Sequence, residues 1–578
     1  MANSIKKRGQ KIVNKFSRAS IKASAESKEH IRENLIQRFS HIRNIRLLIV
    51  EWSSLIAALF LFGVAQAFWF GESYAGEVFV DGGTYAEATL GRVNSMNPLF
   101  ATTSSEKVLS ELMFATLAAV DYSGHMGPEL AESITSSEDG QIWTVKLKDG
   151  LLWSDGEPLT VDDVMFTIEL IQNPAANTIY DANLEGVKVR RRDDGKIDFT
   201  LPLGFADFIS ALDIPIVPKH ILDGVPVKTL VEADFSNSPT TSGAFSFNAI
   251  QSTAGEDESI FYLSANPNYY LGKPMVNSFA VHTYPTKEAI IAAINSGAVT
   301  GTGELADGEL NEITLGNYIV RKTPVNSGAF LFFNTSNPNL SKVAMRQAIR
   351  QGINFDAIRE LTDGAMPLDY PILDNQITLS NYPTVPGYDF SAAKSAIGEL
   401  TGGGRIRLNV TTVNSGFLPS VAQAICEQLR ELGFDSDVVL YTENQEFVTN
   451  VISRRNYAIL LYEIELGADP DLLPYYHSSQ VSTAGLNLSN YRNSLVDDLL
   501  IGARDTLDED LRAKKYESLI GYLAEDVPSI GLYQSDFIYI YNKNARVYGE
   551  NVRLVTGMDR FSDITSWAVA RGIRDKTP

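Results

Sequence analysis

The chain has 578 residues, of which 44% are hydrophobic and 21% are charged, and its formal net charge is −21. This length exceeds what one ordinary hydrophobic core supports, so two or three packed units are expected. The acidic balance argues against a nucleic-acid-binding protein, since contacts with phosphates need clustered lysine and arginine.

The N-terminal segment differs in charge from the rest of the chain. Residues 1–46 carry twelve lysine and arginine side chains against three glutamates, Glu26, Glu29 and Glu33, so this segment is +9 and the remainder is −30. Such an asymmetry indicates two different environments. We interpret residues 1–46 as a basic cytoplasmic tail.

The next segment, residues 47–70, is predicted to be a transmembrane anchor. Its sequence, LLIVEWSSLIAALFLFGVAQAFWF, has no charged residue after Glu51 and is long enough for a slightly tilted membrane-spanning helix. Because basic residues precede it, the positive-inside rule places the N-terminus in the cytoplasm and residues 71–578 outside, as in a single-pass protein of the cell membrane. The alternative is a cleaved signal peptide, since Ala65-Gln66-Ala67 resembles a cleavage site.

Beyond residue 75 the chain alternates between strand-like and helical stretches. The stretch SEDGQIWTVKLKDGLLW (137–153) is typical of a β-hairpin bounded by Asp-Gly turns, and Thr160 with Asp163 predicts a capped helix start. Helical spacing follows at 287–297, 341–353 and 419–433. Strand-like stretches flank the last of these helices, and this β-α-β order is typical of an α/β fold.

The sequence carries no recognisable catalytic or metal-binding motif. The six histidines lack metal-ligand spacing, and the chain has neither a G-x-S-x-G elbow nor a phosphate-binding loop. Carboxylates are abundant, but a glycosidase pair is defined by its separation in space. The single cysteine, Cys426, excludes an internal disulfide and is interpreted as a buried structural thiol. We therefore expect a protein that is not an enzyme and uses no cofactor or metal; a secreted hydrolase is the alternative.

Several stretches together resemble the bacterial extracellular solute-binding proteins of family 5, the oligopeptide- and dipeptide-binding components of ABC importers. The densest match is GPELAESITSSEDGQIWTVKLKDGLLWSDGEPLTVDDVMFTIELI (127–171), and NSMNPL (94–99) is similar to the segment after the family's first strand. Further similar stretches follow in the family's order, namely SGAFSF (242–247), LSANPNYYLGKP (263–274), FLFFNTSNPNLSKVAMRQAIRQGIN (330–354) and LAEDVPSIGLYQSD (523–536). The resemblance covers about residues 78–550.

The resemblance implies an α/β, two-lobed periplasmic-binding-protein-like fold of type II with an extra domain, preceded here by one N-terminal transmembrane helix. The lobes would close over a ligand and be joined by two extended crossovers, expected near residues 325–334 and 528–536. The expected boundaries are the tail at 1–46, the anchor at 47–70, lobe I at 75–100 with 235–327 and 528–560, the extra α/β domain at 101–234, and lobe II at 328–527.

The resemblance also implies a carboxylate that pairs with the α-amino group of a peptide, placed after a tryptophan and before a D-P or E-P step. The corresponding stretch is YEIELGADPDLLPYYHSS (462–479), in which Tyr462 stands for the tryptophan if one residue is inserted. With that insertion the anchor is Glu465, and without it Asp469 is the nearby acid in phase. Either carboxylate would gain a charge-assisted hydrogen bond from an ammonium group.

Aromatic and amide side chains are further candidates for ligand contacts. Flat aromatic faces and hydroxyls suit pockets for ligand side chains, and amides suit a ligand backbone. For each aromatic residue the alternative is a place in the core. The candidates are Tyr475, Tyr491, Phe330, Phe332, Asn97 and Asn487.

The expected function is that of a membrane-anchored extracytoplasmic solute-binding protein, which captures peptides and delivers them to an ABC transporter permease by hinge closure. Its partners would be a peptide ligand, the permease subunits and, through the N-terminal helix, the membrane. No nucleic acid is expected, and the protein is expected to be monomeric. Proteins of this kind also bind nickel complexes, haem or oligosaccharides, so another solute is an alternative, as is a sensor of ligand occupancy.

Overall fold

The computed structural model describes residues 46–252, 258–442 and 445–575. The chain divides into two compact units, one made of Met1–Val78 with Arg571–Pro578 and the other of Phe79–Ala570. The predicted basic tail lies outside the described residues except for Arg46. The finer division into two lobes and an extra domain, with its boundaries, stays a prediction.

The described part of the first unit is mainly one long helix. α3 (Arg46–Tyr74) leads into β1 (Ala75–Val80), which forms a two-stranded sheet with β18 (Ala570–Asp575). Many large apolar side chains of α3 are exposed, among them Val50, Trp52, Leu55, Ile56, Leu59, Phe60, Leu61, Phe62 and Val64. Within the part of the chain that the structure describes, no helix has both the length and the apolarity needed to cross a membrane. The predicted span over residues 47–70 is therefore not confirmed.

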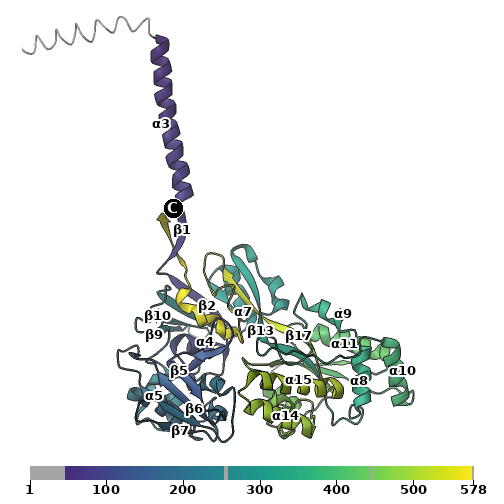
Figure 1. Cartoon of the computed structure of the whole chain (residues 1–578). Coiled ribbons are helices and arrows are strands. Elements are labelled where there is room, and N and C mark those ends of the chain that lie inside the picture. Colours follow the sequence, from purple (N-terminus) through teal and green to yellow (C-terminus); the bar gives the residue numbers. More distant parts are fainter. Residues whose placement is uncertain (1–45, 253–257, 443–444, 576–578) are drawn as a thin grey trace, which may run out of the picture. The chain divides into compact units, whose positions relative to one another are not determined.

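The second unit is built around one ten-stranded mixed sheet (Figure 1). Two long strands, β13 (Tyr318–Phe333) and β17 (Ser529–Asn542), pair antiparallel in its middle. On one side of this pair lie β12 (Gly301–Thr302), β2 (Thr84–Leu90), β11 (Ser278–Tyr284), β10 (Ser259–Ala265) and β9 (Phe245–Ser252). On the other side lie β16 (Ile459–Glu465), β14 (Val410–Val413) and β15 (Val438–Tyr441). The long pair thus connects two halves, the β2 half and the β16 half.

The β16 half has the predicted α/β order. β14 and β15 are parallel, and α11 (Leu418–Leu432) joins them as the predicted β-α-β unit, with Cys426 buried on its inner face. A second hydrophobic core of this half forms where α13 (Leu473–Tyr476) packs with the helices α14 (Ser494–Asp505) and α15 (Glu509–Asp526). The other helices of this half are α8 (Val343–Gly352), α9 (Phe355–Arg359) and α10 (Phe390–Thr401).

The β2 half contains a separate four-stranded sheet in the order β5 (Ala131–Ser136), β6 (Ile142–Leu147), β8 (Ile197–Thr200), β7 (Lys188–Arg191). β5 and β6 form the predicted hairpin, and α5 (Val161–Ile171) begins with the predicted capping box. In that box the Thr160 N–H donates to the Asp163 carboxylate at 2.8 Å. Trp153 is fully buried in the same core. Smaller elements of this half are α4 (Ser104–Met113), β3 (Ala118–Val120), β4 (Met126–Pro128) and α7 (Lys287–Ser296).

The central strand pair is irregular at one point. Pro324 lies opposite Asp536, whereas Gly328 lies opposite Gln534, so β13 bulges between them. In the bulge the Asn326 N–H donates to the Val555 carbonyl oxygen at 2.9 Å. The bulge therefore frees backbone groups of β13 to hold loops from outside the strand pair.

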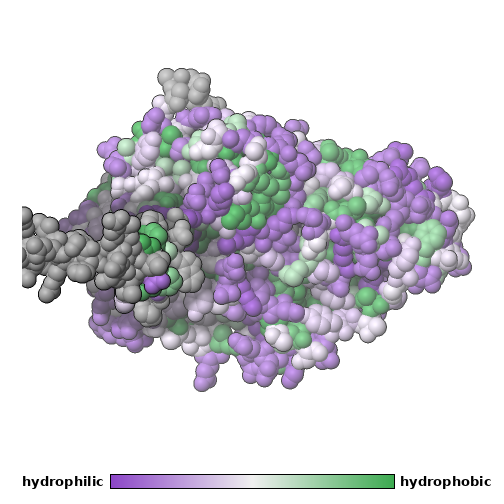
Figure 2. All heavy atoms as spheres, turned by 90° about the horizontal axis from the view of Figure 1, so that it is seen from above, coloured by the Kyte–Doolittle hydropathy of each residue, from purple (hydrophilic) through white to green (hydrophobic). Residues whose placement is uncertain are grey.

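The surface contrasts with this apolar interior. The buried side chains of the described residues form four hydrophobic clusters, the two largest centred on the β2 half and the β16 half. In the view of Figure 2 the outer face is mostly hydrophilic, with smaller hydrophobic groups between the polar ones. This separation is the ordinary result of burying apolar side chains away from water.

Candidate ligand-binding site

The segment predicted to hold the amino group of a ligand starts beside the bulged crossover. Glu465 is the last residue of β16 and lies opposite Ser327 of β13. The next N–H, of Leu466, donates to the Asn326 carbonyl oxygen at 2.7 Å, and the Asn326 side-chain amide donates to the Gly467 carbonyl oxygen at 2.8 Å. The strand register and these two bonds fix the start of the segment against the crossover.

The two candidate anchor carboxylates have different surroundings. Asp469 accepts hydrogen bonds from both terminal nitrogens of Arg512, and the two side chains are only 16% and 9% exposed. Its negative charge is therefore already matched within the protein. Glu465 is exposed, and its carboxylate makes no ion pair with any residue that the structure describes. Of the two acids, Glu465 is the one with an available charge.

A loop of the β2 half, residues 204–207, contacts the same region. The Ala206 N–H donates to the Arg504 carbonyl oxygen at 2.8 Å, and the Arg504 guanidinium lies 4.3 Å from the centre of the Phe205 ring. Burial, followed by the negative charge of Asp469, raises the pKa of Asp207 well above its usual range. This contact brings together segments about three hundred residues apart, and no local sequence pattern predicted it.

A cavity of about 920 Å³ lies at the crossovers. Its walls come from both halves of the unit. They include residues of β13 within 323–326, Gln534 of β17, and residues within 366–375 and 550–554. The volume is within the range of ligand-binding pockets. Asn326, which holds the segment after Glu465, is part of the wall. The cavity is thus next to the segment with the free carboxylate.

Among the described residues, the lining of a second cavity, of about 340 Å³, has no lysine, arginine or histidine and includes five acids: Glu111, Asp121, Glu129, Asp213 and Asp559. Burial, together with the charges of Glu129 and Asp559, raises the pKa of Asp213 to about 7, and burial raises the pKa of Asp559 to about 6. Next to the cavity, the Lys148 ammonium of this chain lies 4.6 Å from the centre of the Tyr270 ring. The electrostatics of this lining favour positive over negative groups.

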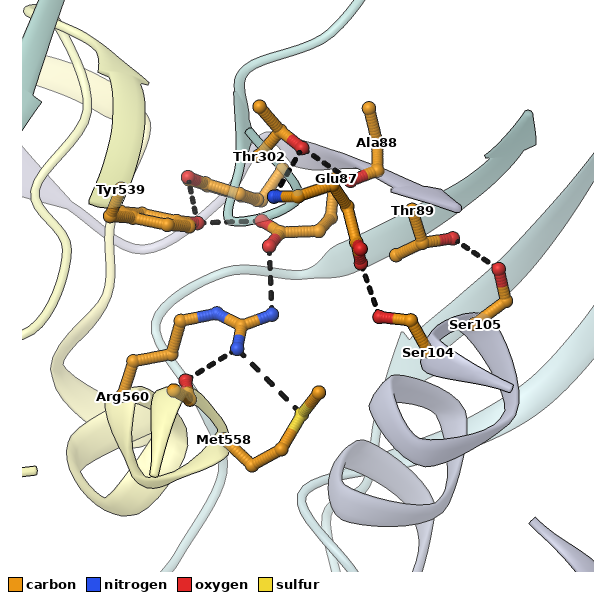
Figure 3. Close-up of polar contacts among 12 residues, drawn as sticks. Glu87, Ala88, Thr89, Ser104, Ser105, Thr302, Tyr539, Met558 and Arg560 are labelled. Carbon is orange, nitrogen blue, oxygen red and sulfur yellow. Dashed lines mark hydrogen bonds and ion pairs between the residues drawn. The ribbon is translucent and has the colours of Figure 1, made fainter. Parts of the chain in front are cut away.

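A buried ion pair holds one wall of this acidic cavity in place (Figure 3). Arg560 Nη2 lies 3.0 Å from Glu87 Oε1, and the Tyr539 hydroxyl donates to the other Glu87 oxygen at 2.6 Å. Arg560 Nη1 also donates to the Gly557 carbonyl oxygen at 2.5 Å. Because residues 556–562 supply cavity-lining side chains, the pair ties that lining to strand β2. Sequence reasoning missed both partners, which are 473 residues apart.

Comparison with known proteins decides which family these features belong to. The family described as bacterial extracellular solute-binding proteins, family 5 Middle, matches residues 125–485, more than half of the chain. The chain belongs to this family. The oligopeptide-binding protein AppA of Bacillus subtilis (strain 168) is 25% identical over 477 residues, which are 78% of this chain and 86% of that protein. Protein XP55 of Streptomyces lividans is 25% identical over 496 residues, 80% of this chain and 86% of that protein.

Solved structures of similar proteins show the same architecture for this family 5 protein. The AppA structure from Bacillus subtilis, in complex with a nonapeptide, has a TM-score of 0.67 at 24% identity and covers 85% of this chain and all of that one (100%). The ABC transporter substrate-binding protein CtaP from Listeria monocytogenes has a TM-score of 0.73 at 25% identity, covering 85% of this chain and 100% of that one. These likenesses confirm the two-lobed periplasmic-binding-protein fold.

In this solute-binding protein, the aromatic candidates on the crossover belong to the core. Phe330 and Phe332 are 0% and 1% exposed and pack in the cluster of the β16 half. Tyr462 lies opposite Phe330 on β16. Tyr475 is closer to the free acid, because its hydroxyl donates to the Glu465 carbonyl oxygen at 2.6 Å. Tyr475 thus contacts Glu465, whereas Tyr462 packs against the core of the β16 half.

The remaining candidates lie in structural hydrogen-bond networks. The Asn487 side chain donates to the Tyr491 carbonyl oxygen at 2.9 Å, and the Tyr491 hydroxyl donates to the Asp526 carboxylate at 2.5 Å. Asn97 is fully buried and accepts the Leu99 N–H at the start of a short helix. These three positions are not in the lining of the two cavities described above. Their ligand-binding roles, like those of the crossover aromatics, stay predictions.

Proposed function

We propose that this protein captures peptides outside the cytoplasm and passes them to the permease of an ABC importer. The observation that carries the proposal is membership of the family 5 solute-binding proteins, together with similarity over most of the chain to an oligopeptide-binding protein. The cavity at the crossovers offers space for a ligand between the two halves, where hinge closure would enclose it. The proposal includes no covalent chemistry, so the protein is not an enzyme.

Within this function, we assign the recognition of the peptide's α-amino group to Glu465. Its carboxylate is exposed, and the segment that follows it is fixed by Asn326 beside the crossover cavity. An ammonium group would have to displace Arg512 from Asp469, whereas none of the described lysines or arginines pairs with Glu465. A hydrogen bond between charged groups at this place would orient the peptide from its N-terminus.

The test uses the purified full chain. Native mass spectrometry identifies copurified ligands, and calorimetry with defined peptides measures affinity. Absence of copurified peptide, combined with no binding of mixed peptides, would contradict the peptide proposal as a whole. Binding of another solute in the same experiments would instead identify a receptor of the same fold with a different ligand.

The role of Glu465 is tested with a double-mutant cycle. Glu465→Gln is expected to weaken binding of a free peptide by about tenfold or more, the loss typical of a charge-assisted hydrogen bond. N-acetylation of the peptide should weaken binding to the unchanged protein by a similar factor and add little in the variant. Glu399→Gln, at an exposed acid on α10, is the matched control and should bind as the unchanged protein does. Equal affinity of Glu465→Gln and the control would move the anchor elsewhere.

We further propose that α3 attaches the protein to the cell membrane, with residues 71–578 outside. The proposal rests on the apolar sequence of residues 47–70 and on the exposed apolar side chains of α3. The double substitution Leu55→Glu with Leu59→Glu should shift the chain from the membrane fraction into the wash fraction. Retention of the variant in the membrane fraction would contradict attachment through α3.

A further inference from the structure

One lysine of the central strand pair contacts carboxylates from both halves of the unit. Lys322 lies on β13, two residues before Pro324, where the bulge begins. Its ammonium group donates to the Asp363 carboxylate at 2.5 Å and also pairs with the Asp307 carboxylate. The Lys322 side chain is 28% exposed, so these contacts lie at the border between the interior and solvent.

The two carboxylates belong to different halves. Asp307 begins a short 3₁₀ helix (Asp307–Glu312) after β12, and Leu305, just before it, packs in a buried cluster with side chains of β2. Asp363 follows α9, and Ile358 of α9 packs in the cluster of the β16 half. Lys322 therefore connects a carboxylate of the β2 half to a carboxylate of the β16 half, next to the bulge.

The lysine compensates a local excess of negative charge. Among the described residues, no other lysine, arginine or histidine pairs with Asp307 or Asp363. Because both carboxylates contact one nitrogen atom, they lie within a few ångströms of each other, where like charges repel. The hydrogen bond from Lys322 lowers the pKa of Asp363. Burial, opposed by the charge of Lys322, raises the pKa of a third carboxyl group nearby, that of Asp536.

The two contacts of Lys322 differ in their exposure to solvent. The Asp307 side chain is 17% exposed, whereas the Asp363 side chain is 73% exposed. Solvent weakens the more exposed pair, so Lys322 is expected to stay with Asp307 when the halves move. The contact with Asp363 is then the one that a rotation of the halves makes or breaks. Because an exposed pair is weak, this contact biases the halves without locking them.

We propose that Lys322, Asp307 and Asp363 form a charge clamp that favours the arrangement of the two halves in this structure. Lys322, held by Asp307, attracts Asp363 of the other half, and opening of the hinge separates these two groups. The clamp rests on the hinge closure of the proposed function. It adds a force within the protein that acts whether or not a ligand is bound.

The experiment measures the distance between the halves in the full chain without ligand. Spin labels attached at Glu288→Cys on α7 and Glu399→Cys on α10 report this distance by pulsed electron paramagnetic resonance, since both positions are exposed and Cys426 is buried. Because no peptide is added, the test of the clamp is independent of peptide binding. A protein that binds no peptide would contradict the proposed function, while the measured distances would still decide on the clamp.

Lys322→Gln removes the cation and leaves the two carboxylates close together. It should lower the ratio of molecules with the label distance of this structure to molecules with any other distance by about twofold to fivefold. Asp363→Asn should have a smaller effect, because Lys322 still pairs with Asp307. Asp356→Asn is the matched control and should leave the distances unchanged, since Asp356 is 93% exposed and pairs with Arg359 of its own half.

A double variant distinguishes charge repulsion from a merely structural role of Lys322. If repulsion between Asp307 and Asp363 separates the halves in Lys322→Gln, adding Asp363→Asn should restore part of the original distance distribution. High salt should make the unchanged protein and Lys322→Gln more alike, because salt screens charges near solvent. The same distribution in Lys322→Gln as in Asp356→Asn, or no recovery in the double variant, would overturn the proposal.

Discussion

The β2 half and the β16 half each contain a buried arginine–carboxylate pair, and the two pairs differ in their neighbours. Arg560 and Glu87 are 2% and 0% exposed, and Tyr539 donates to the same carboxylate. Arg512 and Asp469 are 9% and 16% exposed, and a third charged group, Asp207, lies close enough to repel Asp469. The first pair is enclosed, while the second forms part of a contact between the halves.

The difference shows how one type of interaction can serve two purposes. The enclosed pair ties residues 556–562 to β2. Because both charges are buried, the loss of either one would leave the other without a partner. At the second pair, Asp207 comes from the β2 half and responds to the charge of Asp469. That electrostatic balance therefore depends on the contact between residues 204–207 and Arg504. We infer that the first pair is a rigid support and the second is sensitive to pH and to hinge motion.

The largest expected effect is the loss of the enclosed pair. Arg560→Ala leaves Glu87 buried without its cation and should reduce the free energy of unfolding by about 3–5 kcal/mol, measured by urea denaturation. Arg190→Ala is the control, because the Arg190 side chain is 78% exposed and its pair with Asp198 should contribute under about 1 kcal/mol. Similar losses in the two variants would mean that burial does not set the strength of these pairs.

The second pair should be less costly to break. Asp469→Asn removes one charge from a partly exposed pair and should reduce the free energy of unfolding by about 2 kcal/mol. In this variant Asp207 is the remaining acid near Arg512. Replacing Asp207 in the Asp469→Asn variant should therefore reduce the free energy of unfolding more than replacing Asp207 in the unchanged protein. Additive losses in the double variant would show that Asp207 and Arg512 do not interact.

A substitution far from both ion pairs provides a reference for these losses of stability. Asp163→Ala removes the reciprocal cap of α5 and should reduce the free energy of unfolding by about 1–2 kcal/mol. Because Asp163 belongs to neither pair, its effect should add to that of Asp469→Asn when the two are combined. Peptide affinity measured by calorimetry should stay within about twofold of the unchanged protein. A large loss of affinity would link α5 to the ligand site.

The smallest expected effect is a change of stability with pH. Because the folded-state pKa of Asp207 is raised, its contribution is complete below pH about 4 and is lost as pH rises through that pKa. The unchanged protein should therefore lose stability relative to Asp207→Asn as the pH rises from 4 to 8. Urea titrations at several pH values measure this difference. Parallel pH curves for the two proteins would contradict the raised pKa.

Local patterns in the sequence predicted those elements whose cause is local. The hairpin of β5 and β6 follows from alternating side chains between Asp-Gly turns, and the start of α5 follows from the Thr160 and Asp163 box. The β-α-β unit around α11 has an apolar helix face and two strand-like flanks. The two-lobed fold was predicted from motifs in their order, and the family and the solved structures confirm it.

The candidate site was predicted only in part. The segment 462–479 could be placed from its sequence, but the choice between Glu465 and Asp469 needed the position of Arg512, 43 residues further along. Asn326 carried a weak signal, since it precedes the SGAFLF stretch that begins at 327. The predicted roles of Phe330 and Phe332 rested on residue type alone, which does not distinguish a pocket wall from a core.

By itself, the sequence determined the charge asymmetry, the α/β order, the capped start of α5 and the segment that holds the two candidate anchor acids. These depend on residues close together in the chain. Only the tertiary structure decided that Asp469 is neutralised and that Glu87 meets Arg560. The physical reason is that the energy of a charge depends on its burial and on partners within a few ångströms, and folding brings those partners from anywhere in the chain.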